Sequence, residues 1–181
     1  RTGELLWRRP VVEGVRLILN NGRMISPWPI RTGVHVLEGT AYCAASFLPW
    51  ESTHVAAFDA RTGEIKGAQH YVRDLGTGWT MEGPLLLSGD SIIVPQGRVA
   101  PLVLDRATGE PRGALSGGGG SFVLLTEDDG VLHGPGNKAG WITDSDGTSR
   151  EKIASYQRGN AMIVDGPTAW MLADETLSAL D

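Results

Sequence analysis

Apolar residues occur in this chain as short runs separated by turn sequences, and there are few long stripes of apolar positions at helical spacing. The runs 85–87, 91–94 and 101–104, for example, are separated by Gly89-Asp90 and by a segment around Gly97. Short apolar runs bounded by glycine, proline and aspartate are typical of β-strands joined by tight turns. The pattern therefore predicts an all-β protein built from antiparallel hairpins.

One turn phrase recurs along the chain. Asp-x-x-Thr-Gly-Glu occupies residues 59–64 and 105–110, and its last part, Thr-Gly-Glu, stands at residues 2–4. A phrase that recurs beside apolar runs indicates a repeat architecture. An aspartate at a strand end accepts backbone N–H bonds from residues just ahead, and glycine adopts a positive φ without steric cost. We therefore interpret the phrase as a structural turn in preference to a calcium-binding loop.

The spacing of the turns predicts the fold class. The aspartates taken as equivalent are Asp59, Asp105, Asp144 and Asp181, at intervals of 46, 39 and 37 residues. Intervals of this length are usual for four-stranded propeller blades, whereas leucine-rich and ankyrin repeats are shorter. We predict a β-propeller of four-stranded antiparallel blades, with about four blades in this chain.

The predicted organisation is a single β-propeller domain, or a fragment of one, over residues 1–181. The predicted repeats are 33–67, 83–115, 121–156, and 161–181 plus 1–9, with an inserted hairpin in 10–32. The last copy lacks a fourth strand, which residues 4–8 would supply. Two alternatives stay open: the two ends meet in one composite blade, or the chain is an arc of a larger ring.

Composition restricts the function classes. The formal net charge is −5 with no basic stripe, which argues against a nucleic-acid partner, and no uninterrupted apolar segment approaches the length of a membrane span. Cys43 is the only cysteine, so the chain alone forms no disulfide and no zinc cluster of cysteines. The four glycines at 117–120 lack the lysine and serine or threonine of a phosphate-binding loop. We predict no metal site.

Loop topology predicts where a ligand would bind. In an up-and-down blade successive turns alternate between two sides, so the second turns and the blade-to-blade links share one side. This second-turn face comprises the predicted loops 48–53, 95–100, 134–139, 68–82 and 117–120. Loops on a rigid scaffold commonly carry binding residues. The candidate ligand-binding residues on this face are Trp79, Gln96, Arg98, His133, Asn137 and Lys138.

These residue types suggest the kind of ligand. Arg98 and Lys138 supply positive charge, Trp79 a stacking surface, and Gln96 and Asn137 hydrogen-bonding groups, so we expect a protein partner or an anionic or polyhydroxylated small molecule. Each residue also has a structural interpretation. His133 would then be a strand-end histidine bonded to a backbone carbonyl, and Arg98 would pair with a loop acid.

The six tryptophans divide by position. Trp7, Trp141 and Trp170 are predicted to pack in the core or between blades, because large aromatic side chains bury much apolar area. Trp28, Trp50 and Trp79 fall in predicted loops.

The amino-acid sequence of the repeats resembles that of a known family. Leu-Asp-x-x-Thr-Gly-Glu before an apolar strand with tryptophan, together with Gly-Thr-Ala-Tyr at 39–42, resembles the pyrroloquinoline-quinone-like (PQQ-like) repeat of the quinoprotein alcohol-dehydrogenase-like β-propellers. Ser-Pro-Trp-Pro at 26–29 and Val-Pro-Gln-Gly-Arg at 94–98 are similar to large uncharacterised planctomycete-type bacterial propeller proteins. The resemblance implies an extracytoplasmic location, in the periplasm or cell envelope.

Two function classes follow from the resemblance. The first is a non-catalytic binding or protein-interaction scaffold, with its ligand on the second-turn face and no cofactor. The alternative is part of a PQQ-dependent quinoprotein dehydrogenase that oxidises alcohols or sugars and holds PQQ with calcium. Such enzymes carry a vicinal Cys-Cys disulfide, whereas Cys43 stands alone here. We therefore favour the scaffold and assign no catalytic residue.

Overall fold

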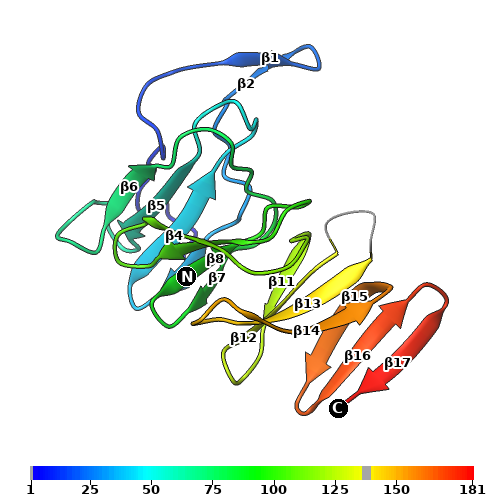
Figure 1. Ribbon diagram of the computed structural model, residues 1–181. Coiled ribbons are helices and arrows are strands. Elements are labelled where there is room, and N and C mark those ends of the chain that lie inside the picture. Colours follow the sequence, from blue (N-terminus) through cyan, green and yellow to red (C-terminus); the bar gives the residue numbers. More distant parts are fainter. Residues whose placement is uncertain (1, 136–139) are drawn as a thin grey trace.

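The computed structural model describes residues 2–135 and 140–181, and every regular element in them is a β-strand, as Figure 1 shows. The predicted all-β class is confirmed. No helix of a length and apolarity suited to crossing a lipid bilayer occurs within these two ranges.

Four antiparallel sheets follow one another in chain order. Sheet 1 contains β3 (His35–Leu37), β4 (Thr40–Ala45), β5 (His54–Asp59) and β6 (Tyr71–Asp74). Sheet 2 contains β7 (Leu86–Ser88), β8 (Ser91–Val94), β9 (Leu102–Asp105) and β10 (Pro111–Ala114). Sheet 3 contains β11 (Phe122–Leu125), β12 (Gly130–Gly134), β13 (Trp141–Asp146) and β14 (Lys152–Gln157). Sheet 4 contains β15 (Gly159–Asp165), β16 (Thr168–Ala173) and β17 (Thr176–Leu180).

A separate hairpin precedes sheet 1. Its strands are β1 (Ile18–Asn20) and β2 (Arg23–Ile25), in a register that pairs Asn20 with Arg23. The two turn residues, Asn21 and Gly22, have positive φ angles of 48° and 75°. Positive φ at both positions is the geometry of a type I′ turn, which Asn-Gly favours. The hairpin predicted within 10–32 is therefore present.

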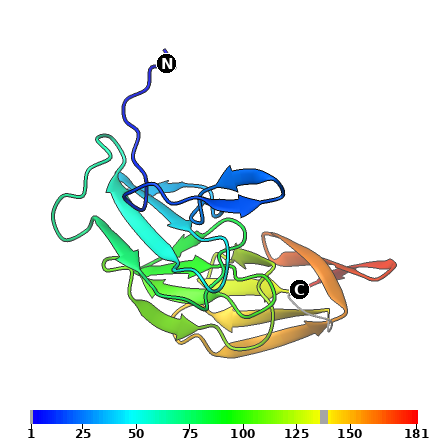
Figure 2. The same cartoon turned by 90° about the horizontal axis from the view of Figure 1, so that it is seen from above.

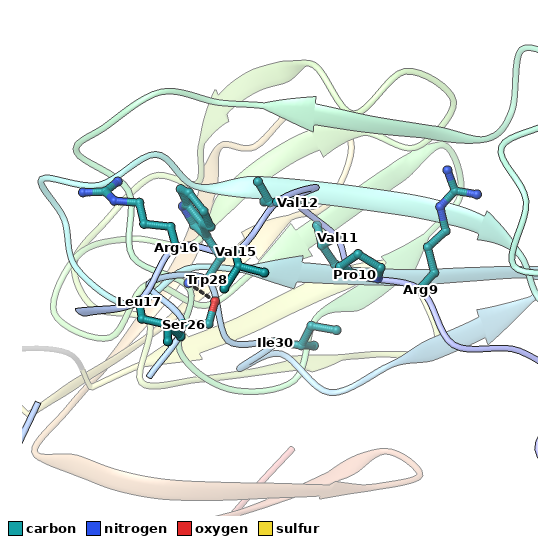
Figure 3. Close-up of a pocket in the computed structure, with 11 residues that line it drawn as sticks. Arg9, Pro10, Val11, Val12, Val15, Arg16, Leu17, Ser26, Trp28 and Ile30 are labelled. Carbon is teal, nitrogen blue, oxygen red and sulfur yellow. Dashed lines mark hydrogen bonds between the residues drawn. The ribbon is translucent and has the colours of Figure 1, made fainter. Parts of the chain in front are cut away.

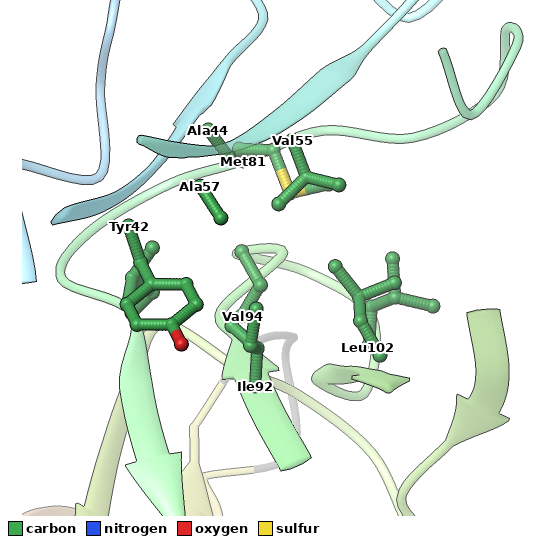
Figure 4. Close-up of a cluster of buried hydrophobic side chains, with 10 residues drawn as sticks. Tyr42, Ala44, Val55, Ala57, Met81, Ile92, Val94 and Leu102 are labelled. Carbon is green, nitrogen blue, oxygen red and sulfur yellow. The ribbon is translucent and has the colours of Figure 1, made fainter. Parts of the chain in front are cut away.

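Sheets pack face to face through apolar side chains that alternate along each strand. Tyr42, Ala44, Val55 and Ala57 of sheet 1 face Ile92, Val94, Leu102 and Leu104 of sheet 2, with Met81 of the intervening link between them (Figure 4). The opposite face of sheet 1 presents Cys43, Ala45, Ala56 and Phe58 to Val11, Val12 and Trp28. Two further clusters join sheet 2 to sheet 3 and sheet 3 to sheet 4.

The repeated phrase forms the turn after the third strand. The Oδ1 atom of Asp59 accepts the backbone N–H of Thr62 at 2.7 Å, and Asp105 accepts that of Thr108 at 2.8 Å. Gly63 and Gly109 have φ angles of 71° and 72°. The structural interpretation of the phrase is confirmed.

In sheet 3 the equivalent aspartate is Asp146, and the predicted equivalence of Asp144 was wrong. Asp146 accepts the backbone N–H of Thr148 at 2.9 Å, while Asp144 lies within β13 opposite Ala154. The glycine position of this turn is taken by Arg150, at a φ of 67°. Two aspartates two residues apart, with no Thr-Gly after either, made the sequence ambiguous.

In sheets 1 to 3 the first and third turns are joined on one side of the molecule. The residue after each turn aspartate donates its backbone N–H to a first-turn carbonyl: Ala60 to Gly39 at 2.8 Å, Arg106 to Asp90 at 2.7 Å, and Gly147 to Asp129 at 3.1 Å. The predicted alternation of turns is confirmed, because these two classes of turn meet.

In sheets 1 and 2, an aromatic ring from the segment that precedes the sheet packs against the glycine of the Asp-x-x-Thr-Gly turn. Trp7 lies so close to Gly63 that a Cβ atom there would stand 2.6 Å from its Cδ2, and its indole N–H donates to the carbonyl of Ala60 at 3.2 Å. Tyr71 lies over Gly109 in the same way and donates to the carbonyl of Arg106 at 3.0 Å. Trp7 therefore packs on a neighbouring sheet, as predicted, although residues 2–10 form no strand.

Two expectations fail, and of the two alternatives left open for the chain ends the structure shows the arc. The fourth strand of sheet 1 is β6, which lies beyond the predicted repeat 33–67, so residues 68–70 precede it and lie on the side of the Asp-x-x-Thr-Gly turns. Trp141 and Trp170, predicted to be packed, are 39% and 45% exposed. The sheets form an open arc, and the composite blade is not formed: residues 4–8 lie apart from β17 in both views (Figures 1 and 2).

Candidate functional site on the second-turn face

Backbone hydrogen bonds tie two loops of the second-turn face to the links between sheets. Between β4 and β5, Pro49 accepts the N–H of Gly78 at 2.6 Å, and Thr53 accepts that of Leu75 at 2.8 Å. Between β8 and β9, Gly97 exchanges two hydrogen bonds of 2.9 Å with Gly120. The β4–β5 and β8–β9 loops are therefore fixed to the scaffold at their backbones.

Trp79 is half-buried in the link between sheets 1 and 2. Its indole N–H donates to the carbonyl of Leu75 at 3.0 Å, and its ring packs against the core shared by these sheets. The hydroxyl of Thr53 donates to the carbonyl of Trp79 at 3.1 Å. Trp79 therefore joins the link to the loop between β4 and β5.

Gln96 is buried at the start of the loop between β8 and β9. Its Nε2 donates to the carbonyl of Ala100 at 2.8 Å, and its own backbone carbonyl accepts the hydroxyl of Thr80 at 3.0 Å. Gln96 therefore closes the base of the loop on which Arg98 stands.

His133 is fully buried in β12, with both ring nitrogens in hydrogen bonds. Nδ1 lies 2.8 Å from the carbonyl of Gly119, and Nε2 lies 3.2 Å from the hydroxyl of Ser145. Burial lowers the pKa of His133, because it penalises the charged imidazolium. The structural interpretation of His133, as a histidine bonded to a backbone carbonyl, is confirmed.

Arg98 is exposed on the loop that Gln96 closes. Asn137 and Lys138 lie outside the described residues. The structure thus brings Gln96 and Arg98 together in one loop and links Trp79 to the same sheet pair. A single pocket shared by all six candidates stays a prediction.

The candidate ligand-binding residues left out two exposed side chains on this face, of which the sequence analysis had placed Trp50, but not Val99, among its polar and aromatic loop residues. Val99 follows Arg98 and is 55% exposed, and Trp50, in the loop between β4 and β5, is 69% exposed. Trp50 was predicted to be a loop residue but was not among the candidate ligands. Its signal in the sequence was a tryptophan beside Pro49 and Glu51, between two strands. Val99 had a comparable signal, an apolar residue within a loop.

His70 lies on the other side of the molecule from where the link 68–82 placed it. Its Nε2 lies 3.3 Å from the hydroxyl of Thr40, which begins β4. A cavity of about 330 Å³ on that side is lined by charged residues from sheets 1 and 2. Arg112 pairs with Asp90 and Asp105, and Arg106 with Glu38, so two arginines offset two of the three acidic charges.

A second cavity, of about 390 Å³, lies beside the inserted hairpin (Figure 3). Its lining is mainly apolar, with Val11, Val12, Val15 and Trp28 among its residues. The guanidinium of Arg16 lies 5.7 Å from the ring centre of Trp28 and pairs with Glu51. This cavity borders the outer face of sheet 1.

Groups suited to metal or covalent chemistry are few in the described parts of the chain. Within residues 2–135 and 140–181, no three or more His, Cys, Asp and Glu side chains are grouped so that they could hold a metal ion. Burial raises the pKa of Cys43 to about 11, so its thiol stays protonated at neutral pH. Cys43 therefore belongs to the packing of sheet 1.

Comparison with known proteins places the architecture. No family model matches the chain, and no curated protein does. BamB from Moraxella catarrhalis, a β-propeller, superposes with a TM-score of 0.61 at 20% identity, over 90% of this chain and 48% of BamB. The chain has a β-propeller fold.

Two computationally designed proteins superpose on this propeller chain as well. Ika4 matches with a TM-score of 0.59 at 15% identity, over 93% of this chain and 98% of Ika4. Ika8 matches with a TM-score of 0.58 at 15% identity, over 82% of this chain and 44% of Ika8. The propeller chain thus spans about half the length of BamB, and its four sheets correspond to blades of an open arc.

Proposed function

We propose that this chain is a non-catalytic PQQ-like propeller module that acts as a protein-interaction scaffold and binds its partner through the second-turn face. The observation that carries the proposal is the set of exposed side chains on fixed loops, namely Trp50, Arg98 and Val99. The similarity to BamB supports a scaffold at the level of the fold.

Residue type favours a protein partner. Tryptophan and arginine are among the residues most enriched at the positions that dominate binding energy in protein interfaces. An exposed apolar group such as Val99, next to Arg98 in the chain, adds area that a partner would cover. Arg98 gives the face a cation in a chain of net charge −5, so we expect an acidic group on the partner near it.

Loop rigidity favours binding by a preformed surface. The hydrogen bonds at Pro49, Gly97 and Gln96 fix the loops that carry Trp50 and Arg98. A loop already ordered before binding loses less conformational entropy on association. In this proposal Trp79, Gln96 and His133 hold the face in shape, and Arg98 contacts the partner.

Photo-crosslinking tests this proposal. A photoreactive amino acid at Val99 is compared with one at Ala107, an exposed residue of the Asp-x-x-Thr-Gly turn in sheet 2, on the other side of the molecule. In extract of the source organism we expect one protein to crosslink from position 99 and not from position 107. Equal crosslinking from both positions, or none from position 99, would contradict the proposed face.

The proposal includes no cofactor and places the protein outside the cytoplasm, the latter by family resemblance. Adding PQQ and calcium to the purified protein should leave the absorption spectrum equal to the sum of the components, and a shifted band would favour the dehydrogenase. Fractionation of native cells should recover the protein in the periplasm or envelope. Recovery in the cytoplasm would contradict the location.

A further inference from the structure

The cavity of about 330 Å³ between sheets 1 and 2 lies on the side of the Asp-x-x-Thr-Gly turns. Cavities that bind small molecules usually have volumes from about 300 Å³ upward. Its wall is formed by the first turn of sheet 1, by β4, by two turns of sheet 2 and by β10. Both sheets have four strands and share an apolar core beneath it. The cavity is therefore a property of one complete junction between two sheets.

The charged side chains of this cavity carry one more negative charge than positive. Its wall contains the carboxylates of Glu38, Asp90 and Asp105 and the guanidiniums of Arg106 and Arg112. Arg112 donates to Asp90 at 2.8 Å and to Asp105 at 2.5 Å. These hydrogen bonds lower the pKa of Asp90, so its carboxyl stays ionised at neutral pH. Because both arginines are already paired, an anion would have to displace a carboxylate, whereas a cation would meet the excess negative charge.

The hydroxyl group of Tyr42 also belongs to the cavity wall. Tyr42 is 6% exposed, and its hydroxyl points away from Ala44 and Val55 (Figure 4). Within residues 2–135 and 140–181 this hydroxyl makes no hydrogen bond. A largely buried hydroxyl without a partner is unfavourable unless water or a ligand binds it. Tyr42 therefore offers a polar group to a molecule in the cavity.

Thr40 offers a second hydroxyl, because of its contact with His70. The backbone N–H of Lys66 donates to Nδ1 of His70 at 3.4 Å, so the proton of the neutral ring is on Nε2. Nε2 lies 3.3 Å from the hydroxyl oxygen of Thr40 and donates to it. The proton of this buried hydroxyl is then free for another acceptor. Gln69 adds an amide to the same wall.

We propose that this cavity binds a small polyhydroxylated amine, such as an amino sugar. The ammonium group is held by Glu38, whose contact with Arg106, at 3.4 Å, is longer than a normal hydrogen bond and leaves the carboxylate able to accept another. The hydroxyl groups of the ligand pair with Thr40, Tyr42 and Gln69. This site lies on the other side of the molecule from the second-turn face, so either proposal can fail without the other.

Three sugars that differ in charge test the class of ligand. Glucosamine, glucose and glucuronate are positive, neutral and negative at mildly acidic pH, and NMR chemical shifts of the isotope-labelled protein report where each one binds. We expect glucosamine to shift the amide signals of Gln69 and Ala107, which line the cavity. Glucose should bind at least roughly tenfold more weakly, since it lacks a charge-assisted hydrogen bond, and glucuronate should not bind. No shift at the cavity with glucosamine, or equally tight binding of glucose or glucuronate, would overturn the proposal.

Glu38→Gln tests the residue that we assign to the amine, and Glu110→Gln is its matched control. Both glutamates are exposed (74% and 62%) and lie close to an arginine, at 3.4 and 3.3 Å, but Glu110 is not part of the cavity wall. The two variants change the net charge equally. Glu38→Gln should weaken glucosamine binding at least roughly tenfold, and Glu110→Gln should leave it unchanged. Equal affinities in the two variants would contradict the site.

Tyr42→Phe removes the second kind of contact, a single hydroxyl. We expect glucosamine to bind about threefold to tenfold more weakly, with the unfolding midpoint unchanged, because this hydroxyl has no partner in the described parts of the chain. Tyr156→Phe, in sheet 3, should leave the affinity unchanged. Unchanged affinity with a lowered midpoint in Tyr42→Phe would show that the hydroxyl stabilises the fold and would contradict its place in the site.

Discussion

Single residues determine how neighbouring sheets meet in this protein. Gly63 is required twice: its φ of 71° disfavours other residues, and its missing side chain leaves room for Trp7. Gly67 shares the first requirement only, because its φ is 69° and a Cβ added there would meet no atom within 4 Å. Substitutions at Gly63 and Gly67 therefore separate the effect of backbone strain from the effect of disturbing the packing of Trp7.

Gly63→Ala should destabilise the protein more than Gly67→Ala. A positive φ costs alanine about 1–2 kcal/mol at either site, and overpacking against Trp7 adds roughly 1–3 kcal/mol at Gly63. Chemical denaturation of both variants measures the difference. Equal losses of unfolding free energy in the two variants would show that the packing of Trp7 does not require glycine at position 63.

His133 should make stability depend on pH. Its pKa in the folded protein lies below the unfolded value of about 6.5. The unfolded chain therefore binds a proton first as the pH falls, so the contribution of neutral His133 is complete above about pH 6.5 and is lost below it. Unfolding midpoints at pH 7.5 and pH 5 should differ less in His133→Gln than in the unsubstituted protein. The exposed His35 supplies the control, His35→Gln, which should keep the full difference.

At the scale of strands and turns, much of the structure could be predicted from apolar runs. The runs 91–94 and 102–105 became β8 and β9, and the Asn-Gly pair at 21–22 gave the predicted hairpin. The strand β6 was missed because the segment 64–70, which contains a turn-favouring glycine, separates it from the Thr-Gly turn. A local pattern contains no information on how far a loop extends before the chain pairs again.

The candidate site was predicted less well, for a physical reason. Polar and aromatic residues in a loop either contact a ligand or stabilise the loop itself, and the sequence does not distinguish these two roles. Gln96 and His133 proved to be buried hydrogen-bonding groups, whereas Trp50 proved to be exposed. Which partner a side chain finds depends on residues distant in sequence, such as Gly119 for His133.

Between sheets 2 and 3 the equivalent contact is made by the residue of the turn itself, which reaches back to the fourth strand of sheet 2. Arg150 replaces the glycine, and its guanidinium donates to the carbonyl of Arg112 in β10. Arg150→Ala loses this contact and keeps the strain of a φ of 67°, whereas Arg150→Gly loses the contact and relieves the strain. We expect Arg150→Ala to be less stable than Arg150→Gly by about 1 kcal/mol in thermal unfolding. The reverse order would show that unfolded-chain entropy outweighs the strain.

At the scale of the whole molecule, the stacked sheets form an arc with two different kinds of surface. The second-turn face carries exposed side chains on fixed loops, and the side of the Asp-x-x-Thr-Gly turns carries paired charges. Stacking between sheets gives the loops their positions without any contribution from the exposed residues themselves. Mutation of the exposed loop residues is therefore expected to weaken partner binding without lowering the stability of the fold.

Affinity measured against stability tests the central proposal most directly. The Trp50→Ala, Arg98→Ala double variant should bind the partner captured from position 99 at least roughly tenfold more weakly, since residues of this type often dominate an interface. Its unfolding free energy should stay within about 0.5 kcal/mol of the unsubstituted protein, because both side chains are exposed. Unchanged affinity in a normally folded double variant would contradict the second-turn face as the binding surface.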